Sequence, residues 1–272
     1  MEQQYLFICG CPRSGTTALV RLLNSHNSLA IGMERYKYYA NSKNISQINH
    51  EAFKSQTFFD LQDSQTNINW KYFYDELIDK YQSGVKYLGD KYPHYYRFYP
   101  QINHNLGDVK WIFIIRDVVS IANSYNARAA DPKDKWSQKA NFQKAVEHWN
   151  ESLVSTWKYQ KNNPNPKLFV CEYERLFNYD LDYLNSLLDF LEVDSDCQTE
   201  TFFAEMKQAW LAKKATKPPS SLKLNEMELQ YIQEHANFAL KDSLLKKFSR
   251  PPLVRTCPPN SFGGLYRPVK VS

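Results

Sequence analysis

Eight consecutive residues near the N-terminus combine glycine, hydroxyl side chains and an arginine, and this combination could bind an anion. They are Gly10-Cys11-Pro12-Arg13-Ser14-Gly15-Thr16-Thr17, which we call the phosphate loop. Glycine lets the chain turn tightly, so that successive backbone N–H groups point into one concavity. The apolar spacing of Leu19, Leu22 and Leu23 predicts that a helix follows, with the positive end of its dipole at the same place. The hydroxyl groups and the guanidinium add donors suited to anionic oxygens.

The phosphate loop lacks the lysine found in loops that bind nucleoside triphosphates. Those loops have the form G-x-x-x-x-G-K-[ST], and the lysine reaches the β- and γ-phosphates. This chain has Thr16 at that position, while Arg13 stands two residues before the second glycine. The pattern therefore favours an anion other than a magnesium-bound triphosphate. Elsewhere no His or Cys pair has the spacing of metal ligands, so we expect no metal site.

A second pair of anion-binding residues follows the most apolar strand of the sequence. Residues 110–115 predict a buried strand, Arg116 comes directly after it, and Ser124 lies eight residues further on. If a helix begins at Val118, Ser124 lies about two turns along the chain from Arg116. An arginine at the carboxyl edge of a strand and a hydroxyl on the next helix can converge on one phosphate, at the edge where open parallel sheets bind their ligands. Two separate phosphate sites indicate a nucleotide that is phosphorylated at both ends.

The elements that must position these residues alternate between strand-like and helix-like patterns. This alternation favours βαβ units and an α/β fold with a central, mainly parallel sheet flanked by helices. Glu34 directly follows the second predicted strand, and Lys91 follows the third, which places both at the same sheet edge as the phosphate loop. The predicted strands are residues 5–9, 29–33, 85–88, 110–115 and 167–171, and further helices are predicted from Val118, over 142–161 and around 181–191.

The length and composition fit one folded domain, residues 1–272. The chain has 43% hydrophobic and 23% charged residues and a net charge of +5, with no long basic run, so we expect no nucleic-acid partner. No apolar run approaches the roughly 20 residues of a membrane span. The five cysteines are odd in number, which favours reduced thiols and a cytoplasmic location. We expect residues 35–84 to form a helical insertion near the active site and residues 249–272 an irregular tail; the pattern leaves the oligomeric state open.

The motifs, taken in order, resemble the P-loop-type sulfotransferases that use 3′-phosphoadenosine 5′-phosphosulfate (PAPS). Residues 12–17 match the family's P-[KR]-S-G-[ST]-[ST] loop, and Arg116 with Ser124 matches its 3′-phosphate motif. Residues 89–93, GDKYP, are similar to the G-[DE]-K-x-P segment of the carbohydrate and tyrosylprotein branches. Tyr173 lies in a stretch similar to Y-E-x-L. The resemblance covers about residues 5–195; Ser261-Phe262-Gly263-Gly264 stands where the animal cytosolic branch has its R-K-G-x-x-G loop.

This resemblance implies a reaction and a set of roles. PAPS would be the sulfuryl donor and 3′-phosphoadenosine 5′-phosphate (PAP) the product, with no metal required. Pro12 to Thr17 would bind the 5′-phosphosulfate, Arg116 with Ser124 the 3′-phosphate, and Tyr173 would lie near the adenine. Glu34 would be the general base, Lys91 would neutralise the bridging oxygen, and Arg13 would contact the departing phosphate.

Several alternatives stay open at the level of the sequence. His94 is a second candidate base, whereas His148 is expected on the outer face of its helix because Trp149 lies in the apolar stripe.

Two other functions are also compatible with the sequence. A small-molecule kinase would need a magnesium-binding carboxylate, for which Asp117 is a candidate. A nucleotide-binding protein without transfer activity is a third possibility, against which Glu34 and Lys91 argue. The acceptor is expected to be a small molecule, with hydroxyl and amine both open.

Overall fold

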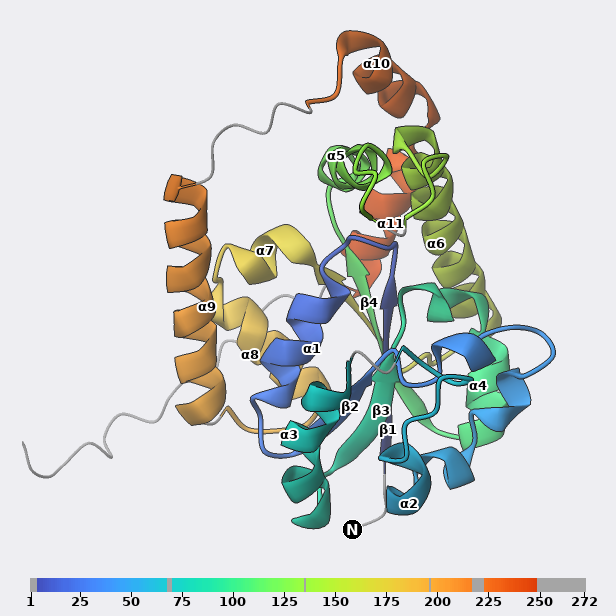
Figure 1. Ribbon diagram of the computed structural model, residues 1–272, viewed down its shortest axis with the longest axis vertical. Coiled ribbons are helices and arrows are strands. Elements are labelled where there is room, and N and C mark those ends of the chain that lie inside the picture. The colour runs from blue at the N-terminus through green and yellow to red at the C-terminus, as the bar shows by residue number, and fades with distance from the viewer. Residues whose placement is uncertain (1–3, 68–69, 135, 196, 217–222, 249–272) are drawn as a thin grey trace, which may run out of the picture.

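A central sheet with helices on both sides forms the core of the computed structural model (Figure 1). The structure describes residues 4–67, 70–134, 136–195, 197–216 and 223–248. Within them the sheet has five strands in the order β2-β3-β1-β4-β5, and all four strand pairings are parallel. The predicted α/β class with a mainly parallel sheet is confirmed. The tail predicted for residues 249–272 lies outside the described residues.

The strands are short and almost wholly buried, as expected for a parallel sheet covered on both faces. Their bounds are β1 Gln4–Gly10, β2 Leu29–Met33, β3 Tyr87–Lys91, β4 Val109–Ile115 and β5 Leu168–Glu172. β1 lies between β3 and β4, so the chain leaves it toward β2 on one side and later reaches β4 on the other. In open α/β sheets such a change of direction opens a crevice at the carboxyl ends of the strands. The phosphate loop after β1 and Arg116 after β4 both lie there.

The third strand was predicted to end too early. The predicted strand ended at Leu88, before Gly89-Asp90-Lys91, whereas β3 continues to Lys91. Gly89 pairs with Leu6 of β1, and a Cβ at Gly89 would lie 1.6 Å from the Leu6 carbonyl oxygen. Glycine therefore serves here for close backbone approach inside the sheet.

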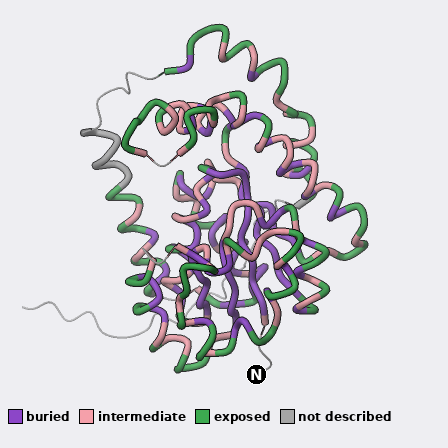
Figure 2. Tube along the Cα trace, turned by 45° about the vertical axis from the view of Figure 1, so that its right-hand side comes forward, coloured by how far each residue is buried: buried purple, intermediate pink, exposed green. Residues whose placement is uncertain are grey.

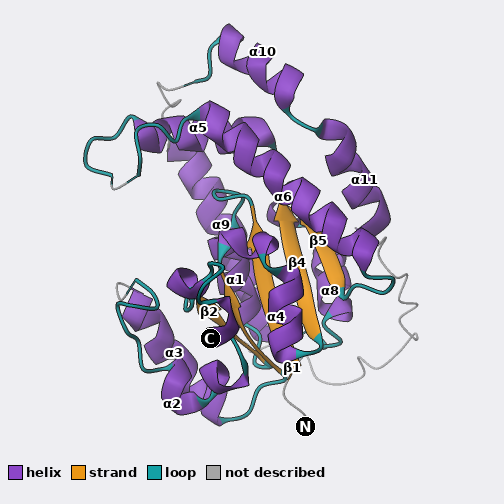
Figure 3. Ribbon diagram, turned by 90° about the vertical axis from the view of Figure 1, so that its right-hand side faces the viewer, coloured by secondary structure: helices purple, strands orange, loops and turns teal. Residues whose placement is uncertain are grey.

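Helices form the two outer layers. In Figure 1, α1, α8 and α9 lie to one side of the sheet, and α4 and α6 lie to the other; Figure 3 shows α4 and α6 in front of the strands. No described helix is long and apolar enough to cross a membrane. The α-helices are α1 Thr16–Asn24, α2 Ser55–Phe58, α3 Lys71–Gln82, α4 Tyr99–Leu106, α5 Val118–Ala129, α6 Phe142–Asn162, α7 Tyr173–Phe177, α8 Leu181–Phe190, α9 Cys197–Thr216, α10 Glu226–His235 and α11 Phe238–Phe248.

The segment 35–84 is built mainly from short helices. Besides α2 and α3 it holds the 3₁₀ helices η1 Lys37–Tyr39, η2 Ile45–Gln47 and η3 His50–Phe53. A further 3₁₀ helix, η5 Pro93–Arg97, follows β3 and packs on β1.

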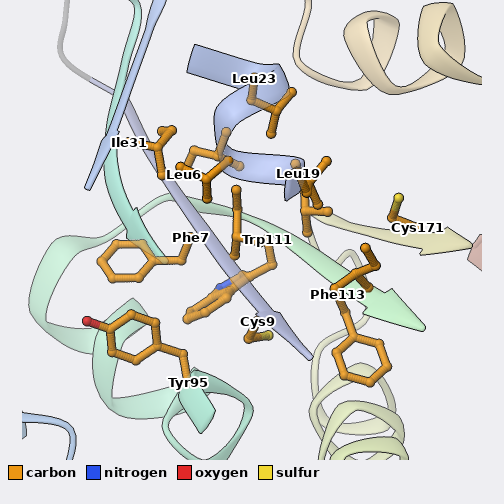
Figure 4. Close-up of a cluster of buried hydrophobic side chains, with 14 of the residues drawn as sticks. Leu6, Phe7, Cys9, Leu19, Leu23, Ile31, Tyr95, Trp111, Phe113 and Cys171 are labelled. Atoms are coloured by element: carbon orange, nitrogen blue, oxygen red, sulfur yellow. The ribbon is translucent and has the colours of Figure 1, made fainter. Parts of the chain in front are cut away.

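The hydrophobic core lies on both faces of β1 and β4. Figure 4 shows Leu6, Leu19 and Leu23 on one side of the strands, and Phe7, Tyr95 and Trp111 on the other. Phe7 packs edge-on against Tyr95, with ring centroids 5.3 Å apart. Burial is concentrated in the strands, while α10 is mostly exposed (Figure 2). This core fixes the carboxyl ends of β1 and β4 relative to each other, and hence the two predicted anion sites.

Candidate active site

The phosphate loop adopts the tight conformation that its glycines predict. Gly15 has a φ of 97°, and Arg13, with a φ of 72°, also adopts the left-handed region. The N–H of Ser14 donates to the Cys11 carbonyl at 3.0 Å, which closes the turn. The Ser14 side chain is fully buried, yet its hydroxyl has no hydrogen-bond partner among the described residues. A buried polar atom without a partner is costly, so this hydroxyl fits a site completed by a ligand.

Tyr173 packs directly over Gly15. A Cβ at position 15 would lie 2.5 Å and 2.6 Å from two atoms of the Tyr173 ring. The ring also stacks on Arg116, whose guanidinium carbon lies 4.3 Å from the ring centroid. Tyr173 begins α7, directly after β5. The tyrosine therefore forms a wall shared by the phosphate loop and by Arg116.

Arg116 and Ser124 both contact Arg13 of the phosphate loop. Arg13 donates from Nε to the Ser124 hydroxyl at 2.9 Å, and Arg116 donates from a terminal nitrogen to the Arg13 carbonyl at 3.1 Å. The indole N–H of Trp149 donates to the Arg116 carbonyl at 3.1 Å and anchors it to α6. The Nε of Arg116 is buried and has no partner within the described part of the chain. Two buried donors without partners among the described residues, the Ser14 hydroxyl and this guanidinium N–H, thus lie one at each of the two predicted anion sites.

A cavity of about 590 Å³ lies in front of the phosphate loop, between β2, α5 and α7. Its positive charge is dense: burial lowers the pKa of Arg13, and the nearby charges of Arg128 and Arg116 lower it further. An anion in the cavity would relieve this repulsion. The residues lining it are Pro12, Arg13, Gly15, Thr16, Thr17, Ala18, Arg21, Glu34, Pro93, Arg116, Arg128, Trp136 and Tyr173.

Glu34 and Lys91 form an ion pair at the edge of this cavity. Lys91 Nζ lies 3.2 Å from Glu34 Oε1 and donates to the Thr17 hydroxyl at 3.2 Å. The second carboxylate oxygen of Glu34 lies 3.3 Å from Lys37 Nζ. The Lys91 side chain is fully buried, whereas that of Glu34 is 17% exposed. The pair therefore connects the predicted base to the phosphate loop through Thr17.

Charge and burial act in opposite directions on this pair. Burial by itself raises the pKa of Glu34, but Lys91 and then Lys37 outweigh it, so that the pKa lies below its ordinary value. Burial lowers the pKa of Lys91, and the neighbouring Glu34 carboxylate partly offsets that effect. Glu34 is consequently ionised at neutral pH and can accept a proton.

The alternative base, His94, lies in a separate polar group. Its Nδ1 is 3.0 Å from the Tyr96 hydroxyl, and burial, followed by the charge of Arg97, lowers its pKa to about 3. The expectation that His148 lies on the outer face of α6 is wrong. Its ring packs edge-on against His94, with centroids 5.2 Å apart, and its Nδ1 lies 3.0 Å from the Tyr125 hydroxyl. Tyr125 belongs to α5, which packs on α6, so this part of α6 faces a neighbouring helix and His148 is partly buried.

Sequence reasoning missed three residues near the cavity, which are Arg128, Trp136 and Lys37. Arg128 pairs with Asp134 at 2.6 Å and lies 4.5 Å from the Trp136 ring centroid. Arg128 follows Ser124 by four residues in α5, and this spacing puts both on one helix face. The spacing could therefore have predicted that Arg128 lies near the same site as Ser124. The contact of Lys37 with Glu34 depends on the backbone turn at Glu34, for which the sequence held no signal.

Residues 5–196 match the model of the sulfotransferase family, and the chain belongs to this family. Its members transfer sulfuryl groups to an acceptor. Among curated proteins, a candidate protein-tyrosine sulfotransferase of Caenorhabditis briggsae is 23% identical over 196 residues. That match covers 70% of this chain and 66% of the relative, so the chain spans slightly less than two thirds of the relative's length.

Solved structures share the fold at low sequence identity. A mouse sulfotransferase, SULT7A1, solved with PAP, has a TM-score of 0.52 and 10% identity, with 92% of this chain and 91% of that chain covered. A sulfotransferase from Alicyclobacillus acidocaldarius also has a TM-score of 0.52, with 14% identity and coverage of 92% and 98%. These likenesses establish the P-loop-type fold.

Proposed function

We propose that the protein transfers the sulfuryl group of PAPS to a hydroxyl or amine of a small acceptor. The observation that carries this proposal is the pair of buried donors without partners among the described residues, Ser14 Oγ and Arg116 Nε, at two adjoining anion sites. A nucleotide with phosphate groups at both ends supplies acceptors for both. The mouse relative solved with PAP supports the same ligand class.

The residues of the cavity fit this donor. The backbone of the phosphate loop, Thr16 and Thr17 would hold the 5′-phosphosulfate at the N-terminus of α1. Arg116 and Ser124 would hold the 3′-phosphate, and Tyr173 would support the adenine side. Arg13 would change its hydrogen bond from Ser124 to the departing 5′-phosphate, which places its charge where negative charge develops.

Glu34 would act as the general base. In the reaction, an acceptor oxygen or nitrogen forms a bond to sulfur while the bond from sulfur to the 5′-phosphate oxygen breaks. The acceptor's proton passes to Glu34, and PAP leaves with the electron pair. Lys91 already contacts Thr17 of the phosphate loop, and its ammonium would turn from there to neutralise the bridging oxygen.

The Glu34–Lys91 pair would also adjust the basicity of Glu34. Lys91 helps to hold the pKa of Glu34 below its ordinary value. When the ammonium turns toward the developing charge of the leaving phosphate, the carboxylate loses part of that stabilisation. The proton affinity of Glu34 would therefore rise during the transfer, when the acceptor's proton must be taken up.

Two observations disfavour the kinase alternative, for which Asp117 was the candidate metal ligand. The Asp117 carboxylate caps α5 by accepting the Ser120 N–H at 2.7 Å, which gives it a local structural role. Thr16 replaces the lysine of triphosphate loops.

We further propose a cytoplasmic location, because Cys9, Cys11 and Cys171 are free thiols, as in proteins of reducing compartments.

An acceptor screen tests the proposed function. The protein is incubated with PAPS and a metabolite extract, and mass spectrometry detects products heavier by one sulfuryl group. Tyrosine-containing peptides form a second arm, because the curated relative is named for protein tyrosine. Products in the wild-type sample that are absent with Glu34→Gln support the proposal. A parallel sample contains ATP and magnesium in place of PAPS. Phosphoryl transfer in that sample, with no sulfuryl transfer from PAPS, would contradict the proposal.

A further inference from the structure

Glu34 is held in an unusual backbone conformation. Its φ is 57°, in the left-handed region that non-glycine residues seldom adopt. Such strain persists only where surrounding contacts impose it. The N–H of Glu34 donates to the Lys91 carbonyl at 2.7 Å, and the carbonyl of Glu34 accepts from the Thr66 hydroxyl at 2.7 Å. These two contacts fix the peptide groups on each side of the Glu34 Cα.

Asp90, next to Lys91 in β3, holds the two residues that follow Glu34. One oxygen of its carboxylate accepts the N–H of Arg35 at 2.9 Å and that of Lys91 at 2.8 Å. The other oxygen accepts the N–H of Tyr36 at 3.0 Å and the Tyr95 hydroxyl at 2.6 Å. Asp90 is fully buried, so its carboxylate depends on these donors in place of water.

The side chains after Glu34 are equally constrained. The buried guanidinium of Arg35 donates to the carbonyl groups of Thr57, Phe58 and Asp60, at 2.7–2.8 Å. The turn therefore cannot relax by swinging Arg35 outward. If the N–H groups of Arg35 and Tyr36 were released from Asp90, the residue that moves would instead be Glu34, whose side chain is partly exposed.

We propose that Asp90 is a positioning residue that aims the Glu34 carboxylate at Lys91 and the cavity. One carboxylate binds the backbone of the turn after Glu34 and the backbone of Lys91, so it fixes the two groups of the ion pair relative to each other. This inference rests on the proposed function, in which Glu34 accepts the proton.

The first test replaces Asp90 with asparagine. The amide of Asp90→Asn presents N–H groups where one oxygen stood, so part of the turn loses its acceptor. We expect kcat to fall about 10- to 100-fold, the scale of a small misplacement of a catalytic group, while PAP affinity is unchanged. The rate is followed as the slow conversion of PAPS to PAP and sulfate, with water as the acceptor. Tyr95→Phe is the matched control: it removes the fourth hydrogen bond of Asp90, leaves the three N–H donors in place, and should keep kcat near the wild-type value.

A double-mutant cycle separates positioning from other roles. If Asp90 acts through Glu34, adding Asp90→Asn to Glu34→Gln lowers kcat little further; a loss equal to the product of the single losses overturns the inference. Full activity of Glu34→Gln would contradict the proposed base, whereas an impaired Glu34→Gln with an unimpaired Asp90→Asn would overturn only the role of Asp90. Asp90→Glu takes its place in the cycle if Asp90→Asn does not fold.

A crystal structure of the Asp90 variant provides a test that does not depend on activity. We expect Glu34 to leave the left-handed region and to lose its contact with Lys91. A variant in which Glu34 keeps its φ near 57° and its 3.2 Å separation from Lys91 would overturn the inference, whatever the kinetics.

Discussion

Arg13 donates a hydrogen bond of 2.9 Å to the hydroxyl of Ser124, 111 positions further along the chain. The contact joins the loop after β1 to the helix after β4, across the point where the strand order changes direction. It places the two predicted phosphate sites side by side. The relationship also gives each site a separate test, because the residues on the two sides should respond to different phosphates.

Arg116 should distinguish nucleotides by their 3′-phosphate. Arg116→Ala removes a charge-assisted contact and should weaken PAP binding by about 1.5–3 kcal/mol. Adenosine 5′-phosphate, which lacks the 3′-phosphate, should lose little affinity. Isothermal titration calorimetry with both ligands measures the difference, and Ser124→Ala should show the same preference with a smaller loss. Equal losses for the two ligands would refute the assignment of Arg116.

Glu34 should affect turnover without affecting donor binding. Glu34→Gln keeps the size of the side chain but cannot take a proton, so kcat on a hydroxyl acceptor should fall roughly 10²–10⁴-fold. An amine that is already a good nucleophile should suffer less. Steady-state kinetics on both acceptor types, with PAP affinity as the control, provide the measurement. Undiminished turnover of a hydroxyl acceptor would move the base to another group, with His94 the first to examine.

The stability contributed by Glu34 should depend on pH. Its pKa in the folded protein lies below the ordinary value of 4.5. A carboxyl group with a lowered folded pKa stabilises the protein above its unfolded pKa, and that contribution is lost as the pH falls through the folded pKa. The difference in Tm between wild type and Glu34→Gln should therefore be full at pH 7 and should shrink below about pH 4.5. A difference that stays constant across this range would mean that the carboxylate is not stabilised by its lysine partners.

Gly15 should not tolerate a side chain. Gly15→Ala places a Cβ against the Tyr173 ring at a φ of 97°, so we expect a loss of stability on the order of 1–3 kcal/mol. PAP affinity should also fall, because the displaced ring stacks on Arg116. Denaturant unfolding and calorimetry measure the two effects. Tyr173→Ala should relieve the clash but not the backbone strain, so the double variant should recover only part of the stability; no recovery would show that the ring is not the obstacle.

The sequence predicted the parts of the site that depend on strand ends. Each parallel strand ends at the same edge, so identifying the strands was enough to bring Arg13, Glu34, Lys91 and Arg116 together. Contacts made by the backbone were beyond prediction. The left-handed turn at Glu34 and the hydrogen bonds that Asp90 makes to it arise from three segments that pack together, and no local pattern encodes them.

The same limit explains the errors in the fold. The predicted third strand stopped before Gly89, a residue type that is depleted in strands, yet Gly89 pairs with Leu6 of β1 and Ile31 of β2 and the strand continues through it. The position of His148 followed from a stripe drawn on α6 alone. Because α5 packs on α6, the apolar stripe was only part of the buried face.

The identity of the sulfuryl donor is tested by parallel titrations of the wild-type protein. PAP, and ATP with magnesium, are titrated separately by isothermal titration calorimetry, and the PAP titration is repeated with Arg116→Ala. We expect saturable binding of PAP that weakens in the variant, and no comparable binding of ATP with magnesium. Tight binding of ATP with magnesium, together with no binding of PAP, would contradict it.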